Sequence, residues 1–290
     1  MNKDSAIKKY DAIIVGAGFA GIYMLLKLRK LGLSVVILEK ADQIGGTWHW
    51  NRYPGARCDI PSLEYSYQFD HDLQQEWDWS EKYSAQPEIL EYINHVADRF
   101  ELRDGIQFEE EVISANFNDI DSNWSITTSK DDYEAKFCIF ATGCLSVPNK
   151  PHFEGLENFE GELLQTSTWP QDKQDFTGKR VAIIGTGSSA IQSIPLIAQQ
   201  AEELFVFQRT PNYSIPSNNG PMDKALEQEI KSRYPEFRKE NYLNGFGIAA
   251  ISDESLITET DVEEVHAQLE ENWQNAGLGF FGGYADVAMD

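Results

Sequence analysis

Residues 11–40, DAIIVGAGFAGIYMLLKLRKLGLSVVILEK, contain the strand, glycine turn and helix on which the fold depends. The short apolar, β-branched run at 12–15 is typical of a strand buried on both faces. A helix is expected at about 21–31, followed by a second apolar strand at 34–38. A strand, a helix and a further strand in this order predict a βαβ unit of a parallel sheet.

Three glycines lie between the first strand and the helix, in the spacing G-x-G-x-x-G. Gly16 permits the tight turn, Gly18 lets a pyrophosphate approach the backbone, and Gly21 allows the helix to pack closely on the strand. The helix then directs its N-terminal N–H groups and positive dipole end at the phosphates. Glu39, at the end of the second strand, is placed to accept hydrogen bonds from ribose hydroxyls. The pattern therefore predicts a dinucleotide site.

A second unit of this kind is expected at 180–209, with a buried strand at 180–184, a G-x-G-x-x-A turn that opens a helix, and a further strand at 204–207. Its end differs, because Arg209 occupies the place that Glu39 has in the first unit. A carboxylate repels a 2′-phosphate, whereas a guanidinium forms charge-assisted hydrogen bonds with one. The two units therefore require different dinucleotides, and FAD with NADPH satisfies both.

We expect an α/β protein with two Rossmann-like dinucleotide-binding domains of three-layer ββα type, both incomplete at the C-terminus. Apolar periodicity predicts a helix at 86–103, a β meander at 106–126 and another buried strand at 137–140. The expected division of the chain is 1–147 for the first half of the FAD-binding domain, 148–178 for a connecting segment, and 179–290 for the NADP-binding domain.

Residues 45–55 are rich in Gly and Pro, which indicates irregular backbone that lines a site. Aromatic rings and an arginine are dense at 49–55, and we interpret them as a wall of the cofactor site rather than as an ordinary surface loop. Asp59 follows shortly afterwards, between a small and an apolar residue. From its neighbours alone, Asp59 suits a turn as well as a functional group.

The composition excludes several classes of partner. A formal net charge of −23 over 290 residues makes nucleic acid and anionic membranes unsuitable. Cys58, Cys138 and Cys144 lack metal-binding spacing, so no metal site is expected, and unpaired thiols fit a reducing cytoplasm. Residues 1–10 lack the apolar segment of a signal peptide, and no apolar run reaches the roughly 18 residues that span a bilayer. We therefore expect a cytoplasmic protein.

Several motifs in this chain resemble the flavin-dependent Baeyer–Villiger monooxygenases. The resemblance runs from about Tyr10 to the last residue. A fingerprint of that family, F-x-G-x-x-x-H-x-x-x-W-P, aligns on Phe159, Gly161, Trp169 and Pro170, with Gln165 in the place of His. The other motifs that carry the resemblance are GGTWHWNRYPGARCD (45–59), PSLEYSYQFD (61–70), ATG (141–143), GTGSS (185–189) and QRTP (208–211).

The resemblance implies that NADPH reduces FAD, that O₂ adds to the flavin as a C4a-peroxyflavin, and that this peroxide oxidises a ketone to an ester or lactone. Asp59 matches the family aspartate that supports a catalytic arginine, and no residue here is assigned that arginine, since none follows Arg238. The resemblance also implies cofactor-binding residues. They are Gly16, Gly18, Gly21, Glu39, Gly46, Thr47, Trp48, Asp59 and Tyr65 for FAD, and Gly185, Gly187, Ser188, Ser189, Arg209 and Thr210 for NADP.

Family members are about twice this long, so we expect an N-terminal part of a longer enzyme. An N- or S-oxygenating flavin monooxygenase is the alternative enzyme, and Gln165 together with the unassigned arginine keeps this alternative open. A chain that binds dinucleotides without turnover is the alternative outside catalysis. A disulfide reductase is disfavoured because no C-x-x-C or C-x₄-C pair follows the first helix. Neither the ketone nor the oligomeric state is indicated.

Overall fold

The computed structural model describes residues 6–212, 214–244, 247–248, 255–277 and 284. Contacts divide the chain into two compact units. The first unit consists of Met1–Pro54 and Gln86–Asp175, and the second of Gly55–Ala85 and Phe176–Asp290. Residues 55–85 thus lie in contact with a part of the chain that follows them by about a hundred positions, while the boundaries expected at 147 and 178 stay a prediction.

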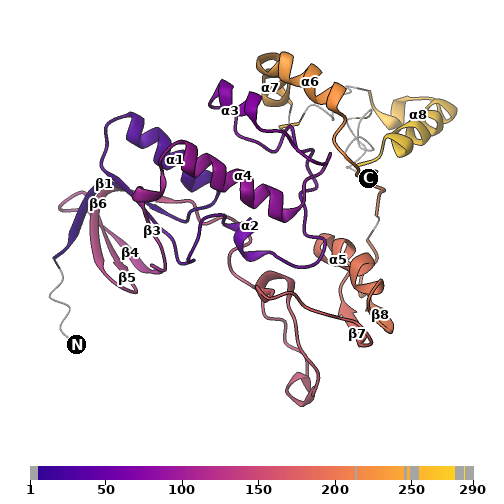
Figure 1. Ribbon diagram of the computed structural model, residues 1–290, viewed down its shortest axis with the longest axis horizontal. Helices are drawn as coiled ribbons and strands as arrows, with labels where there is room; N and C mark the ends of the chain where they lie inside the picture. The colour runs from indigo at the N-terminus through magenta and orange to yellow at the C-terminus, as the bar shows by residue number, and fades with distance from the viewer. Residues whose placement is uncertain (1–5, 213, 245–246, 249–254, 278–283, 285–290) are drawn as a thin grey trace. The chain divides into compact units, whose positions relative to one another are not determined.

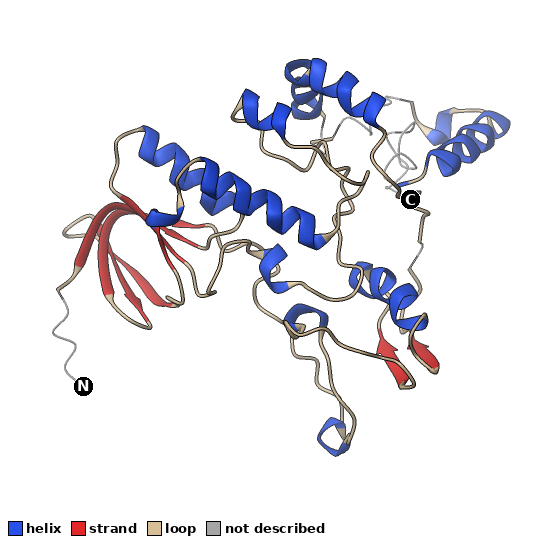
Figure 2. Cartoon of the chain, viewed as in Figure 1, coloured by secondary structure: helices blue, strands red, loops and turns tan. Residues whose placement is uncertain are grey.

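The first unit is built on a six-stranded sheet in the order β3-β2-β1-β6-β5-β4, drawn as red arrows in Figure 2. The central strand β1 pairs in parallel with β2 and β6, so that Ile13 lies beside Val36 on one side and Cys138 on the other. The strands are β1 (Lys8–Val15), β2 (Val35–Leu38), β3 (Ile106–Gln107), β4 (Val112–Asn118), β5 (Asn123–Thr128) and β6 (Asp132–Phe140).

Strands β4, β5 and β6 form the antiparallel meander, which is joined to the parallel strands through β6. The meander therefore begins and ends later than the expected range 106–126, because β3 at the start of that range pairs in parallel with β2 instead. A cluster of buried side chains fixes the register across both parts of the sheet. Its members are Ile13, Val36, Leu38, Ile126, Tyr133 and Ala135.

Two long helices of the first unit bury one apolar face each, α1 (Phe19–Lys30) and α4 (Gln86–Arg99), and both lie beside the sheet in Figure 1. The rings of Phe19 and Tyr92 bring these helices together, with 6.2 Å between the ring centroids. Short turns complete the unit. They are α2 (Thr47–Trp50), η1 (Arg103–Gly105), η2 (Leu156–Asn158) and η3 (Thr166–Thr168).

The second unit contains a parallel pair of strands, β7 (Arg180–Ile184) and β8 (Glu203–Phe207), joined by helix α5 (Ser188–Ala198). The predicted second βαβ unit is therefore present. Further helices come from both stretches of chain that form this unit. They are α3 (His71–Glu76), α6 (Lys224–Ser232), α7 (Tyr234–Leu243), η4 (Ile257–Glu259) and α8 (Val262–Asn275).

The prediction that the strands at 137–140 and 180–184 are buried was wrong. Phe137 and Phe140 of β6 are each 55% exposed, and in the second unit Ile184 is 65% and Phe207 57% exposed. An apolar run reports only that a strand has apolar faces, whereas burial needs a second layer on each face. In the part of the chain that the structure describes, no second layer covers the faces of these strands at the exposed residues just named. Among these same residues, no helix combines the length and apolarity that crossing a membrane requires.

Candidate dinucleotide-binding sites

The first glycine turn is closed by contacts that admit no side chain. Gly16 has φ +104°, and a Cβ on it would lie 2.7 Å from the carbonyl oxygen of Ala141. A Cβ on Gly21 would lie 1.9 Å from the carbonyl oxygen of Gly16. Gly18 is the N-cap of α1, with extended backbone and no side chain over the helix end. No side chain therefore caps the start of α1, which is the arrangement that phosphate binding at a helix N-terminus requires.

Glu39 lies beside this turn, with a carboxylate that is only 5% exposed. Its Oε2 accepts the backbone N–H of Ala17 at 2.6 Å, and its Oε1 accepts that of Ala41 at 2.8 Å. Each carboxylate oxygen keeps a further lone pair, so the group remains able to accept a ribose hydroxyl. The two hydrogen bonds fix the carboxylate at the end of β2, where the sequence places it.

The glycines before α2 pack directly on the first turn. Gly45 donates its N–H to the carbonyl of Ala17 at 3.0 Å, and a Cβ on Gly46, which has φ +53°, would lie 2.9 Å from Cα of Gly18. Helix α2 starts at Thr47, and Trp48 is buried, with its carbonyl accepting a hydrogen bond from the amide of Gln86. The structure therefore brings the predicted residues of 46–48 against the predicted glycine turn.

An open cavity of about 600 Å³ follows β2 in the first unit. His49 and Trp50 from the predicted wall at 49–55 line it, but sequence reasoning did not single out the other lining residues, because they lie in separate segments that only the fold brings together. Lys40 and Trp50 both line the cavity, and the Lys40 Nζ lies over the Trp50 ring, 5.3 Å from its centre. The lining consists of Lys40, Ala41, Asp42, His49, Trp50, Glu109, Glu111, Ser129 and Gln171.

A smaller cavity of about 240 Å³ joins α2 to the fingerprint segment. Trp169 and Pro170 line it together with His49 and Arg52. Burial lowers the pKa of the His49 imidazole, and the nearby Arg52 guanidinium lowers it further, so this histidine is neutral at neutral pH. Arg52 donates to the His49 carbonyl at 2.7 Å. His49 is therefore a neutral wall residue and not a cationic one.

Elsewhere in the fingerprint, Gln165 occupies the position of the family histidine. Its amide donates to the carbonyl of Asn149 at 2.6 Å, which links the two passes of the connecting segment. The Phe159 ring folds over Gly161, where a Cβ would lie 2.5 Å from the ring. A glutamine in this place thus makes a main-chain bond within the segment.

The second glycine turn, at 185–187, has free space around its glycines, whereas the glycines of the first turn are packed against backbone. Gly185 has φ +106°, its N–H donates to the Phe207 carbonyl at 2.8 Å, and a Cβ on either Gly185 or Gly187 would meet nothing within 4 Å. Gly187 is the N-cap of α5 without a side-chain cap, and Ser188 and Ser189 form the first turn of that helix. Arg209 lies after β8, at the same edge of the strand pair and exposed, as does Thr210. The structure gathers these predicted NADP residues at one edge.

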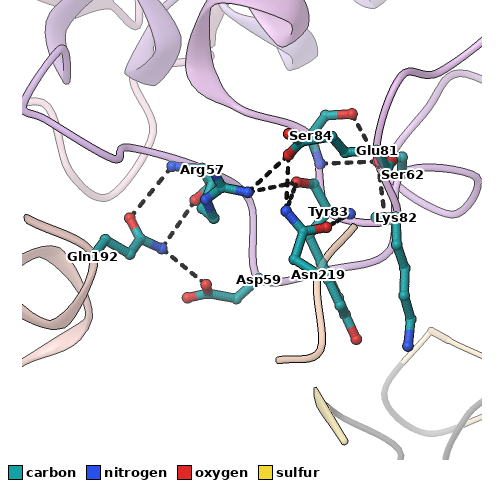
Figure 3. A network of polar contacts seen from close by, with 9 residues as sticks. All are labelled: Arg57, Asp59, Ser62, Glu81, Lys82, Tyr83, Ser84, Gln192 and Asn219. Atoms are coloured by element: carbon teal, nitrogen blue, oxygen red, sulfur yellow. Dashed lines mark hydrogen bonds and ion pairs between the residues drawn. The ribbon is translucent and has the colours of Figure 1, made fainter. Parts of the chain in front are cut away.

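Asp59 and Tyr65 belong to the second unit, although the sequence associates them with FAD. Asp59 is exposed, and its Oδ1 accepts a hydrogen bond from the amide of Gln192 at 2.9 Å (Figure 3). Tyr65 is half-buried, and its N–H donates to the Pro61 carbonyl at 3.0 Å. Sequence reasoning missed Gln192, because nothing in its local pattern connects it to a residue 133 positions earlier.

All three cysteines are free. Cys58 is buried, Cys138 is half-buried and Cys144 is exposed. Burial raises the pKa of the Cys58 and Cys138 thiols to about 11, so both are protonated at neutral pH. A redox pair needs a thiolate, and neither Cys58 nor Cys138 supplies one at neutral pH.

Comparison with known proteins places this geometry in a family. A family model described as pyridine nucleotide-disulphide oxidoreductase matches residues 13–281. A Baeyer–Villiger monooxygenase of Pseudooceanicola batsensis is 40% identical over 286 residues, which are 96% of this chain and 52% of the relative. A phenazine N-monooxygenase of Lysobacter antibioticus is 39% identical over 288 residues, 97% of this chain and 52% of the relative.

A solved structure of a steroid monooxygenase, oxidized and bound to NADP, matches with a TM-score of 0.93 and 48% identity, over 98% of this chain and 54% of that one. The chain spans about half the length of the curated relatives it matches. The predicted α/β fold with Rossmann-like domains is confirmed by this likeness. The resemblance to Baeyer–Villiger monooxygenases is confirmed as well, and the chain belongs to the pyridine nucleotide-disulphide oxidoreductase family.

Proposed function

We propose that this chain holds FAD at its first glycine turn and NADP(H) at its second, as part of a monooxygenase that converts a ketone and O₂ to an ester or lactone. The difference between the two turns carries the proposal. A buried carboxylate, Glu39, lies beside the first turn, whereas an exposed guanidinium, Arg209, follows the second. The first suits free ribose hydroxyls and the second a 2′-phosphate. The match to a structure bound to NADP supports the second assignment.

The residues of the first site would act by binding and orientation. The open N-terminus of α1 receives the pyrophosphate, with Gly18 leaving room for its approach. Glu39 is held in place by two N–H groups before any ligand arrives, so it accepts the ribose hydroxyls without a further cost of ordering. Gly46, Thr47 and Trp48 form the adjoining wall. When bound, the flavin supplies the redox and oxygen chemistry that no side chain provides.

At the second site, the start of α5 would hold the diphosphate of NADP(H). No side chain caps the start of this helix, so the N–H groups of Ser188 and Ser189 in its first turn would bind the diphosphate, and Gly187 leaves the approach open. Arg209, with Thr210 beside it, would bind the 2′-phosphate through its forked N–H groups. Asp59 would take part in the reaction by supporting a catalytic arginine, as the family resemblance implies.

Oxygenation of nitrogen or sulfur is the second candidate. The relative named as a phenazine N-monooxygenase is 39% identical, close to the 40% of the Baeyer–Villiger monooxygenase, so identity does not separate the two chemistries. Gln165 in place of the fingerprint histidine favours this alternative, because an amide cannot take up or release a proton as imidazole does.

We also propose that the protein works in the cytoplasm. Its cysteines are free, and two of them have thiols that stay protonated at neutral pH. Such thiols suit a reducing compartment. Partners other than the cofactors, O₂ and a small organic substrate are not part of the proposal, since a net charge of −23 repels nucleic acid.

The experiment is a visible spectrum of the purified monooxygenase of which this chain is a part, followed by NADPH addition in air with a ketone, a sulfide and an amine offered side by side. We expect flavin absorbance that bleaches with NADPH and recovers in air, with ester or lactone formed from the ketone. Product from the sulfide or amine alone would favour the second candidate. Bound flavin that consumes no NADPH would overturn both and leave a dinucleotide-binding chain without turnover.

A further inference from the structure

The side chain of Gln192 connects helix α5 to the loop that carries Asp59. Its Nε2 donates to Oδ1 of Asp59 at 2.9 Å and to the carbonyl of Arg57 at 3.2 Å, and its Oε1 accepts the Arg57 N–H at 3.3 Å (Figure 3). One amide therefore satisfies both main-chain groups of Arg57 and also holds the carboxylate two positions later. A carboxylate as exposed as that of Asp59 would otherwise rotate between several rotamers.

The loop is also fixed to α5 through its backbone. Gly55 has φ +81°, and a Cβ on it would lie 2.3 Å from the carbonyl oxygen of Gln192. Only a glycine permits this approach, because a side chain would collide with helix backbone. The loop thus touches the main chain and the side chain of the same residue, which makes Gln192 the point where loop and helix meet.

The far side of the loop is anchored independently of α5. Arg57 donates through Nη1 to Oε2 of Glu81 at 2.9 Å and to the Tyr83 carbonyl at 3.2 Å. Asn219 donates to the same Glu81 oxygen at 2.8 Å and accepts the Tyr83 N–H at 2.9 Å. Figure 3 shows these contacts on the opposite side of Arg57 from Gln192. Since this anchor holds the Arg57 side chain, loss of Gln192 frees the Asp59 end of the loop without releasing the whole of it.

Gln192 lies close to the end of α5 at which we propose that the dinucleotide binds. The helix begins at Ser188, so Gln192 lies about one turn after the N-terminus to which we assign NADP(H). A ligand that fixes the first turn of α5 would fix the Gln192 side chain as well. The seating of the dinucleotide and the orientation of the Asp59 carboxylate would then be linked through one residue.

We propose that Gln192 is a positioning residue, which couples the orientation of the Asp59 carboxylate to the occupancy of the dinucleotide site at the start of α5. This inference rests on the proposed function, in which α5 binds NADP(H) and Asp59 takes part in the reaction. Gln192 itself touches neither the reacting atoms nor, in this assignment, the ligand. It acts on both through hydrogen bonds that one substitution removes.

The test measures hydrogen exchange of the Arg57 amide in the flavin-loaded protein, with and without NADP⁺, because this N–H is bonded to Gln192. In the unaltered protein, NADP⁺ should slow the exchange at least threefold. In Gln192→Ala, exchange should be at least tenfold faster and indifferent to NADP⁺, while the Kd for NADP⁺ stays within twofold. The matched control is Gln199→Ala, at the exposed C-terminal end of the same helix, which should behave as the unaltered protein.

A double-mutant cycle supplies the functional readout. Gln192→Ala should lower kcat for ketone oxygenation about tenfold with little change in KM, and it should cause no further loss in an Asp59→Ala background, because residues that act as a unit are not additive. Gln192→Glu keeps the acceptor for the Arg57 N–H but removes the donor to Asp59. It should therefore keep slow Arg57 exchange and lose kcat, which covers the case in which the alanine variant folds poorly.

Equal NADP⁺ protection in Gln192→Ala and the unaltered protein would overturn the coupling. Additive losses in the double variant would also overturn it and leave Gln192 as a structural link between loop and helix. Failure of the proposed function looks different. A protein that binds NADP⁺ and shows the predicted exchange pattern, but oxygenates no ketone, would remove the proposed reaction and keep the coupling.

Discussion

The carboxylate of Glu39 and the backbone N–H of Ala17 form a hydrogen bond of 2.6 Å between residues 22 positions apart. The bond joins the end of β2 to the glycine turn at the end of β1. The two parts of the first candidate dinucleotide site are therefore set relative to each other by the protein alone. A ligand that meets a preorganised site does not have to order it, and its affinity is higher for that reason.

Replacement of Glu39 by alanine should weaken both the fold and flavin binding. The N–H groups of Ala17 and Ala41 would lose their acceptor in buried surroundings, which costs about 1–3 kcal/mol of unfolding free energy. Denaturant unfolding gives the first quantity and the flavin retained after gel filtration gives the second. Glu91→Ala, on the exposed side of α4, is the control and should change neither. Normal flavin retention in Glu39→Ala would contradict the assignment of the ribose site.

Gly187→Ala should separate ligand binding from folding at the second site. The added Cβ meets nothing within 4 Å, and the backbone is extended, so the melting temperature should stay within about 2 °C. The methyl group would nevertheless stand where the diphosphate approaches, and we expect the Kd for NADP⁺ to rise at least tenfold by calorimetry. Gly220→Ala, where a Cβ also meets nothing, is the matched control. Unchanged affinity would show that the ligand does not bind over this turn.

Arg209→Ala should reduce the preference for NADP⁺ over NAD⁺. A hydrogen bond to a charged group contributes about 1.5–3 kcal/mol, so the Kd for NADP⁺ should rise by about 10- to 150-fold. The Kd for NAD⁺, which has no 2′-phosphate, should change little. Arg180→Ala, at the opposite end of the strand pair, removes the same charge and serves as the control. A parallel loss of both affinities would argue against a contact with the 2′-phosphate.

Glu227→Gln should destabilise the second unit, whereas Glu229→Gln should not. Glu227 is 2% exposed, accepts the Trp79 N–H at 3.1 Å and pairs with Lys224 at 2.7 Å. A neutral amide removes the buried charge that lies 2.7 Å from the Lys224 ammonium group and 4.0 Å from that of Lys231, and we expect a loss of about 1–3 kcal/mol in urea unfolding. Glu229 is exposed and 3.4 Å from Arg233, a surface pair whose contribution is within about 1 kcal/mol. Equal effects of both changes would contradict the role of burial.

The cysteines should react in order of exposure. Burial raises the pKa of Cys58 and Cys138 to about 11, so at pH 8 both remain thiols and iodoacetamide should modify Cys144 first, as mass spectrometry of the peptides would show. In the unfolded chain these thiols ionise near pH 8.5. Their contribution to stability is therefore present below that pH and is lost as the pH rises toward 11. Modification of Cys58 before Cys144 in the folded protein would contradict this account.

The local parts of the first site could be predicted from the sequence, because strand, turn and helix lie within one short stretch. Gly16, Gly21 and Glu39 are all where the spacing places them. Contacts made over long separations could not be predicted in this way. The hydrogen bond between Gln192 and Arg57 joins residues 135 positions apart, and no sequence pattern near either residue predicts it.

Burial was the other property that the sequence did not determine. The apolar run that ends at Phe207 indicates a strand, and the strand is present. Whether both of its faces are covered depends on other segments, and in the described residues Phe207 is 57% exposed. For the same reason the neutral state of His49 was not predicted, since it follows from burial and from the position of Arg52.

The membership of residues 55–85 in the second unit has a consequence for synthesis of the protein. The ribosome produces this segment before most of the first unit, and its partners appear only after Asp175. At about 5–20 residues per second, the segment waits for several seconds with its apolar side chains exposed. The two parts of the first unit, on either side of this segment in the sequence, can fold together in the meantime. The nascent chain then contains a nearly folded first unit with residues 55–85 still without the rest of the second unit, and exposed apolar segments of this kind are what chaperones bind.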